Sequence, residues 1–189
     1  MKHQKRSFTL VEILVAAAMI CLLAAVILIA YNGIYRKWAT VNTVAAMKSA
    51  HLVLDRFALE NNQYPVGKNT LGEIAKNSDS AKFIKELFQE CSPYAHKYED
   101  GYVAVFDDFG TKPSADDAEP VAGMQEIFYV YPYNDTNTFV LFSKGKDGEW
   151  AGDDDIIYLP FGLSGVKPGF YYGNVNNYTA YGELEPIAQ

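Results

Sequence analysis

A short basic leader opens the chain, and one long run of apolar residues follows it. Between Ile13 and Ala30, 18 consecutive residues carry no charge. A helix rises about 1.5 Å per residue, so this run spans most of a roughly 30 Å hydrocarbon core. The small residue suited to cleavage, Ser7, precedes the run, whereas the cleavage site of a secretory signal follows its apolar core. The pattern therefore predicts a membrane-length helix that remains in the mature chain.

The helical pattern continues beyond the apolar run. From Tyr31 to Leu59 there is no proline, and apolar residues recur near helical spacing. We expect one helix from Phe8 to about Glu60, with its first half in lipid and its amphipathic second half laid on a globular head. The helix should stop before Pro65, because two asparagines there can adopt a capping conformation and proline forbids continuation.

The remaining residues predict a small head of mixed α and β structure. Apolar spacing across residues 69–91 indicates two short helices, separated by a gap at 77–80. The glycine- and tyrosine-rich tail after Pro160 is expected to form a long loop that packs its tyrosines on the head or on a neighbouring subunit. Short β-branched or aromatic runs predict strands at 101–106, 127–131, 138–142 and 156–159.

Together these patterns predict an α+β fold, in which the long N-terminal helix packs on a small antiparallel sheet. The predicted segments are a leader (1–7), a membrane or filament-core helix (8–30), the amphipathic half of the same helix (31–61) and the head (62–189).

Glu12 is an acid inside the predicted membrane segment. A carboxylate there costs about 2.5 to 3.5 kcal/mol on insertion scales, so it is normally retained for a partner or a function. If the chain is cut before Phe8, the new α-amino group lies about one helical turn from Glu12 and is the obvious partner, in the same chain or in a neighbour. The alternative is that Glu12 sits at the headgroup boundary, close to Lys5 and Arg6.

A second concentration of charge lies between two predicted strands. Residues 143–156, here called the acidic loop, place five carboxylates within nine positions, with glycines at the turns. Such crowding is costly unless a cation neutralises it, and Ca²⁺ prefers oxygen ligands of this kind. The alternative is a solvated acidic turn. Zinc is not favoured, because the three histidines are far apart and show no metal-ligand spacing.

Composition narrows the functional class. Without the leader, 13 basic residues face 23 acidic ones, a charge of about −10, which argues against nucleic acid as a primary ligand. There is no phosphate loop, nucleophile elbow or histidine-containing catalytic cluster, so we predict that the protein is not an enzyme. The basic leader places the N-terminus in the cytoplasm and the head across the membrane.

The N-terminus resembles the class III signal of type IV pilins and type II secretion pseudopilins. The matching residues are the basic leader, the run from Phe8 to Glu12 and the apolar segment. The resemblance implies that a prepilin peptidase cuts between Ser7 and Phe8 and methylates the new amine, and that Glu12 pairs with the amine of an adjacent subunit. The family usually has glycine before the cut, where this chain has Ser7.

The acidic loop is similar to the calcium loop of the major pseudopilin of type II secretion. That resemblance implies Ca²⁺ bound by the side chains of Asp147, Asp153 and Asp155, with carbonyl oxygens from Leu141 and Ser143.

The implied protein is a structural subunit of a type II secretion pseudopilus. It would be a single-pass protein of the bacterial inner membrane with a periplasmic head, and would form a homopolymer through its N-terminal helix together with minor pseudopilins and an inner-membrane assembly platform. Two alternatives remain: a type IV pilus subunit for adhesion, motility or DNA uptake, and a membrane-tethered monomeric module that binds calcium or carbohydrate.

Overall fold

The computed structural model describes residues 9–78, 80–133, 137–150, 152–162, 165–174 and 185–187. The chain divides into two compact units, residues 1–37 and residues 38–189.

Helix α1 (Leu10–Asn61) contains 52 residues and extends through the boundary between the two units. It confirms the predicted single long helix and ends one residue beyond the predicted stop. Asn62 follows the helix with a φ of +59°, the left-handed conformation that asparagine tolerates at a helix end.

Two short helices follow, as predicted. Helix α2 (Leu71–Asn77) begins after Thr70, whose side chain accepts a hydrogen bond from the Glu73 amide. Helix α3 (Ala81–Glu90) begins after Ser80, whose side chain caps the Phe83 amide in the same way. Each cap satisfies a backbone donor that the first turn of a helix cannot satisfy itself.

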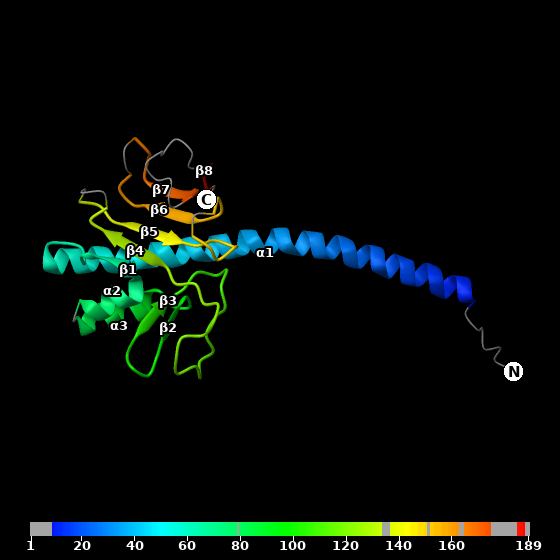
Figure 1. The fold of residues 1–189 in the computed structure, drawn as a ribbon, viewed down its shortest axis with the longest axis horizontal. Coiled ribbons are helices and arrows are strands. Elements are labelled where there is room, and N and C mark those ends of the chain that lie inside the picture. Colours follow the sequence, from blue (N-terminus) through cyan, green and yellow to red (C-terminus); the bar gives the residue numbers. More distant parts are fainter. Residues whose placement is uncertain are drawn as a thin grey trace, which may run out of the picture. The chain divides into compact units, whose positions relative to one another are not determined.

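The head also contains antiparallel strands (Figure 1). The larger sheet has the strand order β1-β4-β5-β6-β7-β8, and a separate hairpin pairs β2 with β3. The bounds are β1 (Gly67–Thr70), β2 (Ala95–Lys97), β3 (Val103–Val105), β4 (Phe128–Tyr131), β5 (Val140–Ser143), β6 (Ile156–Leu159), β7 (Gly169–Tyr172) and β8 (Glu185–Pro186).

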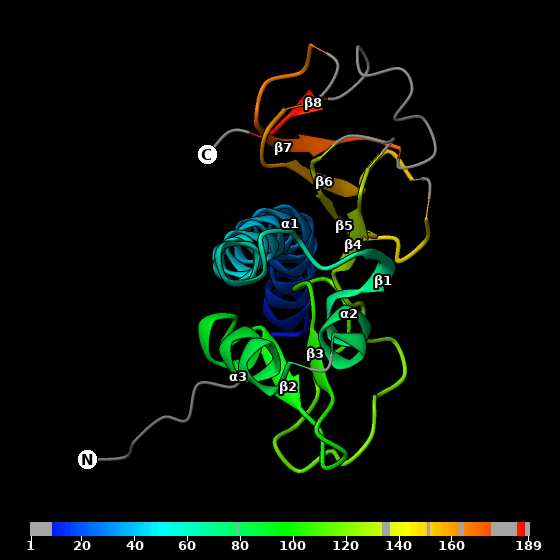
Figure 2. The same ribbon diagram turned by 90° about the vertical axis from the view of Figure 1, so that its left-hand side faces the viewer.

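The core lies on both faces of the larger sheet. Within the second unit, α1 runs between this sheet and the α2–α3 pair, as two perpendicular views agree (Figure 1, Figure 2). Leu141 and Tyr158 face α1 and join Met47 and Leu54 in the main cluster. Their strand neighbours point to the opposite face, because successive side chains alternate across a sheet, and they form a second cluster with Tyr133. That cluster contains Val140, Phe142, Ile157, Leu159 and Tyr171.

The prediction of a long loop after Pro160 is wrong for residues 169–172. Strand β7 pairs with β6 there, with Phe170 opposite Tyr158 and Tyr171 opposite Ile157. Phe170 turns toward the main core and Tyr171 toward the second cluster, so aromatic residues hold alternating buried positions in this strand. The ring of Tyr158 stacks on the ring of Phe170, with their centroids 4.2 Å apart. Part of the tyrosine-rich tail, residues 175–184, lies outside the described residues.

Candidate functional site

The first turn of α1 is closed by a reciprocal capping arrangement. The backbone N–H of Thr9 donates to Glu12 Oε2 at 2.8 Å, and the Thr9 hydroxyl donates to the same oxygen at 2.9 Å. In return, the Glu12 amide donates to the Thr9 hydroxyl oxygen at 3.3 Å. This Thr-x-x-Glu spacing is the capping box, in which a cap residue and the third helical residue satisfy each other's backbone donors.

Glu12 therefore has a partner inside its own chain. The carboxylate accepts a hydrogen bond from the Thr9 amide, which has no acceptor within the helix because no helical turn precedes it. This hydrogen bond lowers the cost of keeping a charge near the start of an apolar helix. Ser7 and Phe8, the predicted cleavage and methylation positions, lie outside the described residues. The pairing of Glu12 with an α-amino group consequently stays a prediction.

The first unit presents its apolar side chains to the surroundings. Within the described residues, helix α1 is the one helix long and apolar enough to cross a membrane by length and composition. Large aliphatic residues are exposed all around its first half, from Leu10, which is 75% exposed, to Ile29, which is 77% exposed. A helix with apolar residues on every side is stable only when lipid or other helices cover it.

The acidic loop joins the ends of β5 and β6 and is organised by one carboxylate. Asp154 Oδ2 accepts hydrogen bonds from the amides of Lys146 and Asp147, at 2.7 and 3.2 Å. Asp147 Oδ1 in turn accepts from the Glu149 amide at 2.9 Å. These contacts fold the loop back on itself, so that its first and last turns touch. Glycine at position 145 permits this closure, because its φ is +63° and a side chain would collide with the backbone oxygen of Asp154.

Two carboxylates of the loop converge on Gly152. A Cβ at this position would lie 2.6 Å from Asp147 Oδ2 and 2.8 Å from Asp154 Oδ1. Glycine is therefore the residue that fits between the two acids. The two oxygens that face Gly152 are not the ones that accept the loop's amides. The result is a pair of carboxylate oxygens that approach the Gly152 backbone closely, and carboxylate oxygens are the hard donors that Ca²⁺ prefers.

The structure places the five predicted ligands differently. Asp147 faces Gly152, whereas Asp153 is exposed and Asp155 is fully buried at the start of β6. Leu141 lies inside β5, paired with Tyr129 and Tyr158 on the two neighbouring strands.

Ser143, the other backbone candidate, is buried at the end of β5, and its hydroxyl donates to Asp107. Among the described residues, no group of three or more histidine, cysteine, aspartate or glutamate side chains is arranged to hold a metal ion. The set of Asp147, Asp153 and Asp155 stays a prediction.

A buried acid beneath the loop was missed by the sequence analysis. Asp107 is 1% exposed, and its carboxylate accepts from the Ser143 hydroxyl at 2.6 Å and from the amides of Phe109 and Gly110 at 3.0 and 3.2 Å. With its amide nitrogen turned toward acceptors, Gln125 donates to Asp107 at 3.2 Å and to the Gly145 carbonyl at 3.0 Å. Burial raises the pKa of Asp107 to about 6, and the hydrogen bonds only partly oppose that rise.

Asp108, the next residue, connects this network to α1. Its carboxylate accepts from the Asn42 amide at 2.9 Å and its backbone N–H donates to the Thr43 hydroxyl at 3.1 Å. The base of the acidic loop is thus tied through Asp107 and Asp108 to the first turns of α1 within the head. Two adjacent acids directly after the predicted strand at 101–106 could have drawn attention to this network. Nothing in the sequence indicated that both acids are buried.

Comparison with known proteins bears on the N-terminus. Residues 2–28 match the family model described as the prokaryotic N-terminal methylation motif. Comparison of the chain with curated proteins and with solved structures gave no match. The matched segment contains residues 2–7 of the leader, the capping box and most of the exposed apolar run. This prepilin-like motif supports a subunit of the type IV pilin and pseudopilin superfamily, processed by a prepilin peptidase and anchored in a membrane by its N-terminal helix.

Proposed function

We propose that this protein is a structural subunit of a type II secretion pseudopilus, polymerised through its N-terminal helix. The observation that carries the proposal is the prepilin-like motif at residues 2–28, combined with a helix whose first half exposes apolar residues on every side. Packing many such helices together would cover this surface once the subunit leaves the bilayer. The acidic loop favours the secretion class, as does a head with a single cysteine, Cys91, which cannot form a disulfide within itself.

A type IV pilus subunit is the second candidate, because the motif is common to both classes. Deletion of the gene separates them: loss of exported enzymes with surface pili intact supports the pseudopilus, whereas loss of surface pili with export intact supports the pilus.

Processing of the N-terminus is a separate test. Mass spectrometry of the mature chain should find a methylated Phe8 at the N-terminus, and a bulky residue in place of Ser7 should accumulate precursor. A mature N-terminus beyond residue 30 would rule out both candidates.

The capping box gives Glu12 two possible contributions to assembly. As a capping residue it completes the first turn of α1, an effect of about 1 kcal/mol. As a charge it can attract the α-amino group of a neighbouring subunit, which in a low-dielectric filament core is the larger effect. Both hydrogen bonds from Thr9 use Oε2, so pairing through Oε1 is compatible with the cap.

Three substitutions separate these contributions. Glu12→Gln keeps an oxygen that can accept from Thr9 but removes the charge, Thr9→Val removes the hydroxyl cap but keeps the charge, and Glu12→Ala removes both. If the charge drives assembly, the glutamine and alanine variants should both lose filaments, and the valine variant should retain most of them. Filament yield is measured by shearing and immunoblotting. Wild-type yield from Glu12→Gln would contradict the pairing and leave the cap as the role of Glu12.

We also propose that the acidic loop binds one Ca²⁺. The support is the close approach of Asp147 and Asp154 to Gly152, where each presents a carboxylate oxygen, and the density of carboxylates nearby. Asp153 and Asp155, with carbonyl oxygens from Leu141 and Ser143, are the remaining proposed ligands. A bound Ca²⁺ would supply charge neutralisation and hold the two ends of the loop together. Binding only to the folded loop would stabilise the head by about 2.7 kcal/mol at a hundredfold excess over Kd.

Calorimetry and thermal unfolding test the calcium proposal. Asp147→Ala should abolish both the heat of binding and the rise in Tm with Ca²⁺. Glu149→Ala is the matched control in the same loop, and it should leave both unchanged. Absence of heat and of thermal shift with the wild-type chain at millimolar Ca²⁺ would return the loop to a solvated acidic turn.

A further inference from the structure

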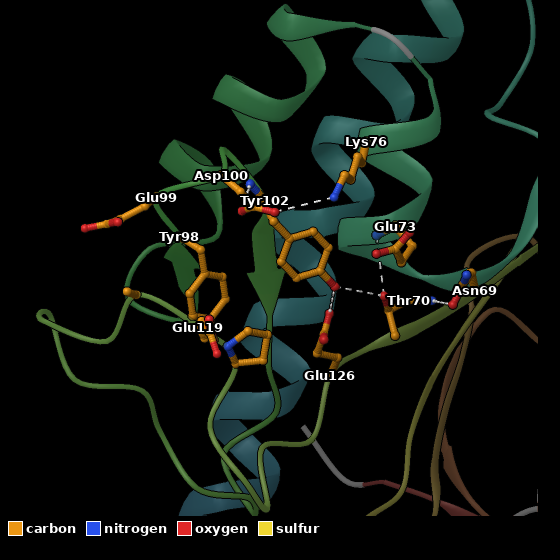
Figure 3. A pocket seen from close by; sticks show the side chains of 12 residues that line it. Asn69, Thr70, Glu73, Lys76, Tyr98, Glu99, Asp100, Tyr102, Glu119 and Glu126 are labelled. Carbon is orange, nitrogen blue, oxygen red and sulfur yellow. Dashed lines mark hydrogen bonds and ion pairs between the residues drawn. The ribbon is translucent and has the colours of Figure 1, made fainter.

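A hollow in the head is lined by residues that belong neither to the acidic loop nor to α1. It has a volume of about 760 Å³ and is formed by α2, the β2–β3 hairpin and the segment 118–126 (Figure 3). Two tyrosine rings, those of Tyr98 and Tyr102, lie nearly parallel in its wall, with centroids 6.0 Å apart and planes inclined by 22°. Pro120 also lines the hollow and adds an apolar surface.

The base of the hollow holds a half-buried carboxylate. Glu126 accepts a hydrogen bond of 2.5 Å from the Tyr102 hydroxyl, and the Thr70 hydroxyl lies 3.2 Å from the same phenol oxygen. In Figure 3 the side chains of Tyr102, Thr70 and Glu126 converge at this point. Burial raises the pKa of Glu126, opposed by the hydrogen bonds from Tyr102 and Thr70, so its ionised form would be stabilised by a nearby positive group.

The charges that line the hollow are unbalanced. Five carboxylates border it, and Lys76 is the single basic residue among its lining residues. The Lys76 ammonium lies 5.8 Å from the centroid of the Tyr102 ring and 3.5 Å from Asp100 Oδ2. The protein therefore already holds one ammonium group against a tyrosine face and a carboxylate here, in the geometry of a cation–π contact.

We propose that this hollow binds an organic cation, namely the alkylammonium or guanidinium group of a free amine or of a lysine or arginine side chain. The ligand's positive group takes the place of the Lys76 ammonium over the ring of Tyr102 and is recognised there by the carboxylate of Glu126. Its alkyl part lies against Pro120. Lys76 occupies part of the same surface and competes with the ligand. The proposal concerns the head alone and does not depend on filament assembly.

The chemistry of the walls excludes other ligand classes. An anion would meet four more carboxylates than ammonium groups, and a purely apolar ligand would leave these charges desolvated. A positive group on an alkyl stem satisfies both the aromatic face of Tyr102 and the acids. A planar guanidinium also stacks on tyrosine, so an arginine probe should bind at least as tightly as a lysine probe.

Isothermal titration calorimetry on the full chain in neutral detergent tests the proposal. The probes are acetyl-arginine amide, acetyl-lysine amide and butylguanidinium, with uncharged acetyl-norleucine amide as the control ligand. The three cations should bind saturably at one site, and the norleucine probe should give no heat. The pentapeptide Ala-Ala-Arg-Ala-Ala distinguishes a polypeptide ligand from a free cation. An affinity well above that of butylguanidinium assigns the site to a polypeptide, and an equal affinity assigns it to a free amine.

Three variants connect binding to the hollow. Glu126→Gln keeps the acceptor for Tyr102 but removes the charge, and it should weaken binding about tenfold or more, as expected for a lost charge-assisted contact. Lys76→Met removes the internal competitor and should strengthen binding. Glu99→Gln is the matched control, because Glu99 borders the hollow but its side chain extends away from Tyr102 and Glu126 (Figure 3). Its affinity should stay close to wild type.

Two outcomes would overturn the proposal. One is the lack of a saturable heat of binding with the wild-type chain at probe concentrations up to about 10 mM. A dissociation constant above that limit would be weaker than the millimolar affinity expected of a single specific contact. The other is an equal loss of affinity in Glu126→Gln and Glu99→Gln, which would reduce the effect to diffuse attraction by an acidic surface. Far-UV circular dichroism on each variant checks that the fold is retained. If Glu126→Gln does not fold, Tyr102→Leu replaces it and carries the same expectation of weakened binding.

Discussion

The buried acid Asp107 should make the head more stable at low pH than at neutral pH. Its ordinary pKa of 3.8 rises to about 6 in the folded chain, chiefly because burial penalises the charged form. The folded state therefore holds a proton that the unfolded state releases between about pH 4 and pH 6. Stability from this group is present below pH 4 and is lost as pH rises through the folded pKa. This rise in the pKa of Asp107 corresponds to roughly 3 kcal/mol of folding free energy.

Asp107→Asn tests this reasoning, because asparagine mimics the protonated acid at every pH. Its oxygen can still accept from Phe109 and Gly110, and its amide can donate to the Ser143 hydroxyl oxygen. The variant and the wild type should have similar free energies of unfolding near pH 4. By pH 7 the variant should be the more stable of the two by up to about 3 kcal/mol, since it avoids the buried charge.

The assay is urea unfolding of the fragment 36–189 at several pH values, with a chelator present to remove divalent cations. Tryptophan fluorescence reports the transition, because Trp150 packs against Phe128 at a ring-centroid distance of 5.4 Å. Asp153→Asn is the control, since Asp153 is exposed in the same region. A difference between Asp107→Asn and wild type that does not change with pH would refute the argument, as would greater relative stability of the wild type at neutral pH.

Three further predictions test the fold around the proposed sites. Gly145→Ala should destabilise the head by about 2 kcal/mol or more, because alanine is strained at positive φ and its Cβ meets the Asp154 carbonyl; chemical denaturation measures this. Tyr129→Phe should cost about 1 to 2 kcal/mol in the same assay, because the buried Pro65 carbonyl loses a 2.7 Å hydrogen bond. Cys91 should resist iodoacetamide at pH 8 until urea is added, since burial raises the pKa of its thiol to about 12; rapid labelling of the folded chain would contradict its burial.

Much of the local structure was predictable because it depends on neighbouring residues. Absence of proline and a recurring apolar face predicted α1 to within one or two residues at each end. The prepilin-like motif at residues 2–28 is contiguous, so the residues that identify it stand next to each other in the chain. The capping box of Thr9 and Glu12 was not predicted, although its two members are only three residues apart in the chain.

A strand was harder to predict where it forms because a neighbouring strand pairs with it. Strand β7 contains glycine and tyrosine in place of aliphatic residues, and it forms because β6 offers Tyr158 and Ile157 as cross-strand neighbours. Strand β1 (Gly67–Thr70) consists of small and polar residues, and its pairing with β4 supplies what its own sequence lacks.

The sequence alone determined the membrane-length helix, the cleavage junction expected before it and the presence of an acidic loop, because each is a contiguous run with a physical cost or use of its own. Only the tertiary structure decided which acids are buried, which of them meet, and which line a hollow. Asp107 is 36 positions from Ser143, and Glu126 is 24 from Tyr102, yet each pair shares a hydrogen bond. Whether such groups are charged depends on the water that packing removes, and packing joins residues that the chain keeps apart.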